Sequence, residues 1–88
     1  MRKDTKPRDF LTRCRVKDVT WRKVRATSPG AAAALYALEN GLETGSLVRV
    51  KPAEGGYEFG TFKVRLVEYR RGRGGAKRVR YFRARRVY

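Results

Sequence analysis

Basic and apolar side chains alternate in four separate segments of this chain, and this alternation constrains the fold more than any other feature. The four segments lie at 10–16, 48–51, 62–66 and 82–85. Successive side chains of a β-strand point to opposite faces of a sheet, so a period of two is typical of a half-buried strand. The sequence therefore predicts a sheet with one apolar face and one basic face.

One helix is predicted at TSPGAAAALYALENGL. Thr27 or Ser28 supplies an N-cap oxygen, and Pro29 suits the first helical turn. Gly41 stands where a left-handed residue ends a helix, and Leu42 follows as the apolar contact of a Schellman motif. We expect the inward face of this helix to hold Ala31, Ala34, Leu35 and Leu38.

The expected elements are strand, strand, helix, strand, strand, strand. The strands are expected at about 10–16, 19–26, 46–52, 57–69 and 78–88. Such a chain forms an α+β fold most readily when the helix covers one face of a small antiparallel sheet. Because 88 residues fit one domain, we expect a flexible basic N-terminus at 1–8 and a single domain at 9–88. A basic hairpin arm is expected at 63–88.

The net charge of +15 is concentrated at the two ends of the sequence. Residues 1–27 hold ten basic and three acidic side chains, residues 28–62 hold two and four, and residues 63–88 hold eleven and one. A field of this sign attracts polyanions, of which nucleic acid is the commonest.

The cost of burying charge predicts whether the numbers of paired residues in the last hairpin add up to an even or an odd sum. Paired residue numbers with an even sum, such as 146, place apolar residues of both strands on one face. An odd sum would bury Arg83 and Arg85 without partners, which costs several kcal/mol. With a sum of 146 the expected pairs are Val64 with Phe82, Phe62 with Ala84, Glu68 with Arg78, Lys63 with Arg83 and Arg65 with Tyr81.

The alternation divides the predicted sheet into an apolar face toward the helix and a basic face. The apolar face is expected to carry Phe10, Cys14, Val16, Val48, Val50, Phe62, Val64, Leu66, Phe82 and Ala84. The candidate nucleic-acid-binding residues on the basic face are Arg13, Arg15, Arg49, Lys51, Lys63, Arg65, Tyr81, Arg83 and Arg85, with Trp21 expected among them. Cations meet phosphates and flat rings stack bases, whereas a generic exposed face would mix in more Asp and Glu.

The segment RRGRGGAK is predicted to be a loop at the hairpin tip. Glycines let the backbone approach a phosphate closely, and flanking arginines can clamp a backbone or enter a minor groove. The candidate binding residues in this loop and at the start of the next strand are Arg70, Arg71, Arg73, Lys77 and Arg78.

The composition argues against an enzyme. The chain has no His and one cysteine, Cys14, which excludes a Cys/His zinc cluster, an intramolecular disulfide and histidine-based catalysis. We expect no catalytic residue, metal or cofactor, and a buried, inert Cys14. The N-terminus lacks the apolar stretch of a signal peptide, and no run approaches a membrane span, so a cytoplasmic protein without membrane contact is expected.

The strand pair followed by ATSPGAAAALYAL is similar to small phage and mobile-element proteins, and the basic hairpin is similar to the arms of ribosomal and architectural DNA-binding proteins. The leading hypothesis is a non-enzymatic protein that binds DNA or RNA mainly through backbone and shape. One alternative is a small phage or mobile-element protein that docks its basic face on an acidic protein partner. Another is a structural component of a ribonucleoprotein or virion. The sequence leaves open a monomer or a homodimer, and single- or double-stranded ligands.

Overall fold

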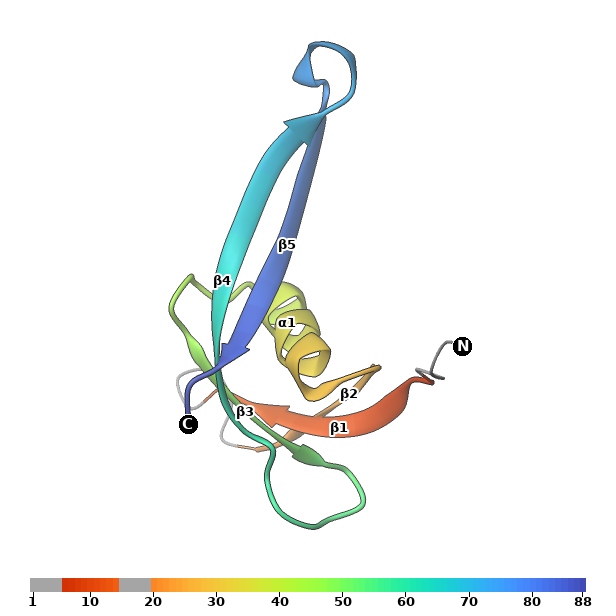
Figure 1. Cartoon of the computed structure of the whole chain (residues 1–88), viewed down its shortest axis with the longest axis vertical. Helices are drawn as coiled ribbons and strands as arrows, with labels where there is room; N and C mark the ends of the chain where they lie inside the picture. The colour runs from red at the N-terminus through yellow and green to blue at the C-terminus, as the bar shows by residue number, and fades with distance from the viewer. Residues whose placement is uncertain (1–5, 15–19) are drawn as a thin grey trace, which may run out of the picture.

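The fold is a five-stranded antiparallel sheet with one helix packed on one face, as the sequence predicts. The computed structural model describes residues 6–14 and 20–88. Its elements are β1 (Arg8–Arg13), β2 (Arg22–Ala26), α1 (Pro29–Asn40), β3 (Leu47–Pro52), β4 (Gly60–Arg71), the 3₁₀ turn η1 (Arg73–Gly75) and β5 (Lys77–Arg86). The strand order is β2-β1-β3-β4-β5, and Figure 1 shows the β4–β5 hairpin extending well beyond the rest of the sheet.

The helix begins and ends at the residues that the sequence indicates. The Ser28 side chain accepts a hydrogen bond of 3.1 Å from the Ala31 backbone N–H, which otherwise has no intrahelical partner. At the other end Gly41 is left-handed, with φ 59°. The Leu42 N–H donates to the Ala37 carbonyl over 3.0 Å, and the Leu42 side chain is buried. These caps fix α1 at three turns between two strands.

The predicted inward face of α1 was wrong for Leu35 and Leu38, whereas Ala31 and Ala34 are partly buried against the core. The buried residues are Ala32, Ala33, Tyr36 and Ala37, whereas Leu35 and Leu38 are 38% and 49% exposed. Alanines facing the sheet let the helix axis come close to it. The Tyr36 ring then fills the remaining space, and its hydroxyl accepts a hydrogen bond of 3.3 Å from the Cys14 backbone N–H.

The apolar face of the sheet faces α1, and we call it the helix face and its opposite the open face. The predicted core residues Phe10, Cys14, Val48, Val50, Phe62, Val64 and Phe82 are all buried, and Leu66 and Ala84 pack against them. Arg15, Val16 and the connection between the strands expected at 10–16 and 19–26 lie outside the described residues. The one buried polar side chain of the described core, Thr12, donates its hydroxyl to the Arg22 carbonyl over 3.0 Å.

The even parity predicted for the β4–β5 hairpin is confirmed, but the pairs are shifted by two residues. Val64 pairs with Ala84 instead of Phe82, so the paired residue numbers sum to 148 instead of the predicted 146. The strands continue to Arg71 and resume at Lys77, so the turn is shorter than the predicted loop. The tip glycines, of which Gly74 has φ 68°, allow this tight turn. The observed pairs are Phe62 with Arg86, Lys63 with Arg85, Arg65 with Arg83, Leu66 with Phe82, Val67 with Tyr81 and Glu68 with Arg80.

The start of β4 also differs from the prediction. The strand begins at Gly60, and Phe59 lies outside it with its ring 5.6 Å from the Phe10 ring in an edge-to-face arrangement. Gly60 has φ 130°, and a Cβ there would lie 2.5 Å from the Tyr88 carbonyl oxygen. Only glycine fits, because the end of the chain passes against this residue.

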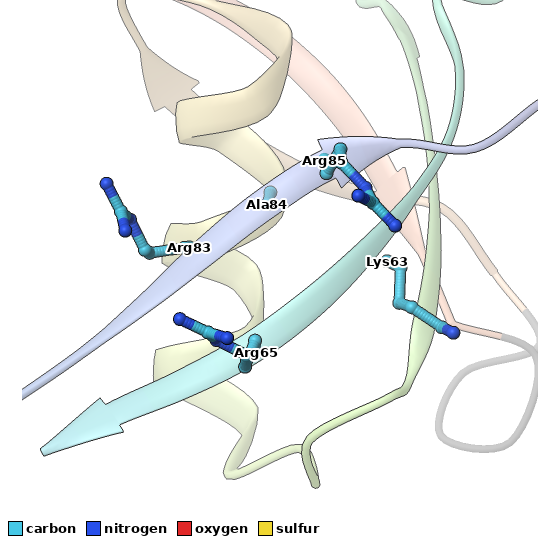
Figure 2. A pocket seen from close by; sticks show the side chains of 5 residues that line it. All are labelled: Lys63, Arg65, Arg83, Ala84 and Arg85. Carbon is cyan, nitrogen blue, oxygen red and sulfur yellow. The ribbon is translucent and has the colours of Figure 1, made fainter.

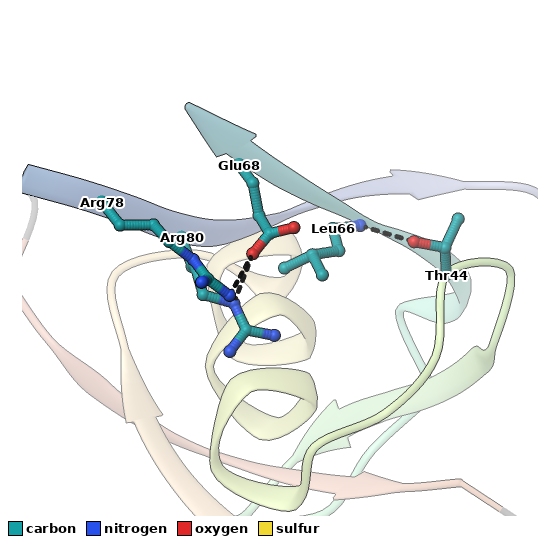
Figure 3. Close-up of polar contacts among 5 residues, drawn as sticks. All are labelled: Thr44, Leu66, Glu68, Arg78 and Arg80. Carbon is teal, nitrogen blue, oxygen red and sulfur yellow. Dashed lines mark hydrogen bonds and ion pairs between the residues drawn. The ribbon is translucent and has the colours of Figure 1, made fainter. Parts of the chain in front are cut away.

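The loop between α1 and β3 holds the base of the hairpin. The Leu66 N–H donates to Thr44 Oγ1 over 3.0 Å (Figure 3), and the Val64 N–H donates to the Ser46 carbonyl over 3.0 Å. Beyond Leu66 the outer edge of β4 has no further neighbour among the described strands. We therefore call residues 67–81 the arm.

In the described part of the chain, no helix has the length and apolar character needed to cross a bilayer.

Candidate nucleic-acid interface

Most of the predicted basic residues lie together on the open face. Arg13 pairs with Arg49 across β1 and β3, Lys63 with Arg85 across β4 and β5, and Arg65 with Arg83 on the next open-face rung of the hairpin. Lys51, Arg71, Lys77 and Tyr81 occupy the same face by strand parity. Arg15 lies outside the described residues.

At the β1–β3 end, the open-face cations have partners within the protein. Arg49 donates to Glu58 through Nε, at 3.2 Å from Oε1, and through Nη2 to Oε2. The Arg49 guanidinium also lies 5.1 Å from the Trp21 ring centroid, and Lys51 Nζ lies 4.2 Å from it. Trp21 is thus on the predicted face, but its ring is covered by two cations rather than open to a base.

The ion pair at this end shifts the ionisation of both partners. The pKa of Glu58 lies below its ordinary value, first because Arg49 donates hydrogen bonds to its carboxylate, and further because Arg49 and Lys51 are positive. The hydrogen bond to Glu58 raises the pKa of Arg49. Both groups therefore remain charged across the physiological range.

Toward the hairpin, the open face carries cations without such partners. Lys63, Arg65, Arg83 and Arg85 line an open hollow at the base of the hairpin, and Figure 2 shows them reaching from the two neighbouring strands. We call these four residues the four-cation patch. All four are exposed, and among residues 6–14 and 20–88 no carboxylate lies within 4.0 Å of any of them.

The four-cation patch is electrostatically unfavourable in the free protein. Directly opposed side chains of an antiparallel pair have Cβ atoms about 4.5–5.5 Å apart, and like charges in that position destabilise the sheet. Lys63 opposite Arg85 and Arg65 opposite Arg83 form two consecutive pairs of this kind. A bound anion would relieve the repulsion.

The predicted clamp of five basic residues at the tip is divided between two faces. Arg71 and Lys77 lie on the open face, whereas Arg70 and Arg78 pair with each other on the opposite face. Arg73 lies in η1 and is exposed. The sequence interpretation ended the fourth strand at Tyr69 and began the fifth at Arg78, so it assigned Arg71 and Lys77 to the loop, whereas they lie in β4 and β5.

The cations on the other face of the arm have contacts within the protein. The Glu68 carboxylate is 3.3 Å from Nη2 of Arg78 and 3.0 Å from Nε of Arg80 (Figure 3). Arg70 donates to the Gly75 carbonyl over 3.1 Å, which braces the tip. Arg80 was not predicted as a site residue, and its contact with Glu68 gives it a structural role.

Sequence reasoning also missed the apolar partners of Tyr81. Val67 pairs with Tyr81, and Tyr69 pairs with Val79 on the next rung of the open face. The two tyrosine rings are 6.3 Å apart and edge to face, and they remain 44% (Tyr69) and 38% (Tyr81) exposed. We call Val67, Tyr69, Val79 and Tyr81 the aromatic strip. The odd numbering that Tyr69 shares with Arg65 is the signal that would have placed it on this face.

The described residues contain no group of three or more His, Cys, Asp or Glu side chains that could hold a metal ion. Cys14 is a free, buried cysteine. Comparison with protein-family models, curated proteins and solved structures found no match to this chain.

Proposed function

We propose that this protein binds nucleic acid, without catalysis, through the four-cation patch and the open face of the arm. The observation that carries the proposal is the pair of consecutive like-charge rungs, Lys63 with Arg85 and Arg65 with Arg83, which lack acidic partners within the described residues. Phosphate groups would supply the missing negative charges. Affinity of this kind is mostly independent of sequence and falls with salt.

The contrast between the two ends of the open face supports this assignment. On β2 the cations Lys23 and Arg25 both lie 4.0 Å from Asp9, and on β3 Arg49 is bound by Glu58. A face that served only solubility would intersperse both signs along its whole length. The acids are instead found at the β1–β3 end, so the free positive field is concentrated on β4 and β5.

The test is fluorescence anisotropy with labelled single- and double-stranded DNA and RNA of matched length at about 150 mM salt, where exposed charges are screened beyond roughly 8 Å. The double variant Arg83→Ser/Arg85→Ser should bind at least tenfold more weakly than wild type. It should retain its fold, because both side chains are exposed.

The matched control is Lys23→Ser/Arg25→Ser. It removes the same charge from alternate open-face positions of the other edge strand, where Asp9 already neutralises part of the field. This control should bind nearly as well as wild type. Equal losses of affinity in the two variants would show that binding depends only on net charge. Failure of wild type to bind any of the four ligands at this salt would overturn the proposal.

A further inference from the structure

The arm has an apolar surface that the fold does not cover. On its open face the aromatic strip lies between two cationic rungs, Arg65 with Arg83 toward the sheet and Arg71 with Lys77 toward the tip. On the helix face, the described core reaches along the hairpin as far as Leu66 and Phe82 and does not include the next rung, Glu68 with Arg80. The strip is not part of the core cluster, and its two tyrosine rings remain partly exposed, so it is accessible to a ligand.

We propose that the aromatic strip binds unpaired bases, so that the ligand class of this protein is single-stranded nucleic acid. This inference rests on the proposed function and deepens it. The cationic rungs at the two ends of the strip would hold the backbone, and Tyr69 and Tyr81 would stack the bases between them. Stacking of this kind tolerates any sequence because every base has a flat π-face.

The dimensions of the strip fit such a ligand. Arg65 and Arg71 are six residues apart on β4, a span of about 20 Å at ~3.3–3.4 Å per residue. The strip occupies the two rungs between them, so its rings lie within one continuous path that starts and ends on a positive rung. Because the two rings meet edge to face, their faces point in different directions and can receive different bases.

A duplex fits this surface less well. In a double helix the faces of the bases are stacked on each other, and the accessible groups are phosphates, sugars and base edges. Those groups would bind the four-cation patch but would leave the strip against polar backbone. An unpaired strand brings both the phosphates and the apolar base faces that the two parts of the surface require.

A second copy of the chain is also a poor occupant. Two strips packed face to face would bring Arg65, Arg83, Arg71 and Lys77 of one molecule against the same cations of the other. None of these four side chains has a carboxylate within 4.0 Å among the described residues that would offset the repulsion. The charge pattern favours a polyanion over self-association.

The test compares a labelled oligothymidylate with a strand of the same length that carries abasic sites, and with a duplex of that length. The abasic strand has the same phosphates and lacks the bases. Wild type should bind the oligothymidylate at least about fivefold more tightly than the abasic strand, since one stacked base contributes roughly a 5- to 150-fold factor. In Tyr69→Leu/Tyr81→Leu this preference should disappear while binding to the abasic strand is retained.

The matched control is Tyr57→Leu, which replaces a tyrosine that is 96% exposed and lies in the loop before β4. It should keep the wild-type preference. As a measurement that needs no variant, the ring protons of Tyr69 and Tyr81 in wild type should shift upfield in nuclear magnetic resonance spectra on adding oligothymidylate, and not on adding the abasic strand.

Equal binding of the base-containing and abasic strands by wild type would overturn this inference and leave the proposed function standing. Tighter binding to the duplex than to the oligothymidylate would do the same. A concentration-dependent dimer that Tyr69→Leu/Tyr81→Leu abolishes would assign the strip to self-association instead. Absence of binding to every ligand at about 150 mM salt would overturn the proposed function itself.

Discussion

Lys63 on β4 and Arg85 on β5 lie directly opposite each other on the open face. The sheet thus brings two like charges together on the surface that we assign to nucleic-acid binding. Cross-strand pairs of opposite charge contribute roughly 0.2–1 kcal/mol, and like charges in the same position are destabilising. This relationship predicts that stability and binding can be separated by one substitution.

Arg85→Glu should stabilise the free protein and weaken its binding to nucleic acid. The new carboxylate would lie opposite Lys63 and near the exposed Arg83. A gain of about 0.5–1 kcal/mol would raise the melting temperature by roughly 2–8 °C in a domain of this size. Thermal unfolding followed by circular dichroism measures the first effect and anisotropy the second. A lower melting temperature would show that these charges do not repel each other in the free protein.

Glu58→Gln should remove one source of acid sensitivity. The pKa of Glu58 is lowered in the folded state, so its ion pair with Arg49 stabilises the fold fully above the ordinary pKa of a glutamate. That contribution is lost as the pH falls through the lowered value. Thermal unfolding of wild type and Glu58→Gln from pH 3 to pH 7 should give curves that separate near neutral pH and converge in acid.

The same ion pair can be followed through Trp21, the one tryptophan of the chain. Loss of Glu58 frees the guanidinium that lies over the Trp21 ring, so the fluorescence of Glu58→Gln should differ from that of wild type at pH 7. If the thermal stabilities of wild type and Glu58→Gln instead differ by the same amount at every pH from 3 to 7, Glu58 does not titrate with a lowered pKa.

Gly60→Ala should destabilise the fold by more than backbone strain alone. The residue has φ 130°, and the added Cβ would meet the Tyr88 carbonyl oxygen at 2.5 Å. Strain in such a backbone conformation costs about 1–3 kcal/mol. Gly55→Ala is the control, because Gly55 has φ 97° and open space around the added Cβ. In urea unfolding, equal losses for the two variants would exclude the contact with the end of the chain.

Tyr36→Phe tests the polar contact that positions the helix. Without the hydroxyl, the buried Cys14 N–H loses its acceptor, which costs about 1–3 kcal/mol. Tyr57→Phe removes the hydroxyl of an exposed ring and should leave the unfolding free energy unchanged. If both variants match wild type, the Tyr36 hydroxyl contributes nothing to stability and the helix is held by apolar packing alone.

Alternation in the sequence was sufficient to predict which strand residues face the helix. Phe62 and Val64 are buried while Lys63 and Arg65 are exposed, because an odd register would have placed arginines in the core. The exact register depends on which residue lies at the centre of the turn, and the sequence has no signal for that position. The observed pairs centre the turn on Gly74 instead of Arg73, which shifts every pair by two.

Contacts made by loops and by the helix could not be predicted from the alternation of apolar and basic residues. Leu35 and Leu38 are the most hydrophobic residues of the helix, yet they are exposed. The helix packs on the sheet through its alanines and through Tyr36, whose hydroxyl accepts a hydrogen bond from the Cys14 N–H. Arg49 meets Glu58 and Trp21, which both lie in connecting segments outside the strands. The division of the open face into a neutralised end and a free end therefore required the structure.

The most direct test of nucleic-acid binding by the four-cation patch is the slope of log affinity against log salt for wild type, Arg83→Ser/Arg85→Ser and Lys23→Ser/Arg25→Ser. Each phosphate that a protein neutralises contributes roughly −0.7 to −0.9 to this slope. Loss of Arg83 and Arg85 should make the slope shallower by about 1.4–1.8, whereas loss of Lys23 and Arg25 should leave it nearly unchanged. Identical slopes in all three proteins would contradict the assignment of phosphate binding to the four-cation patch.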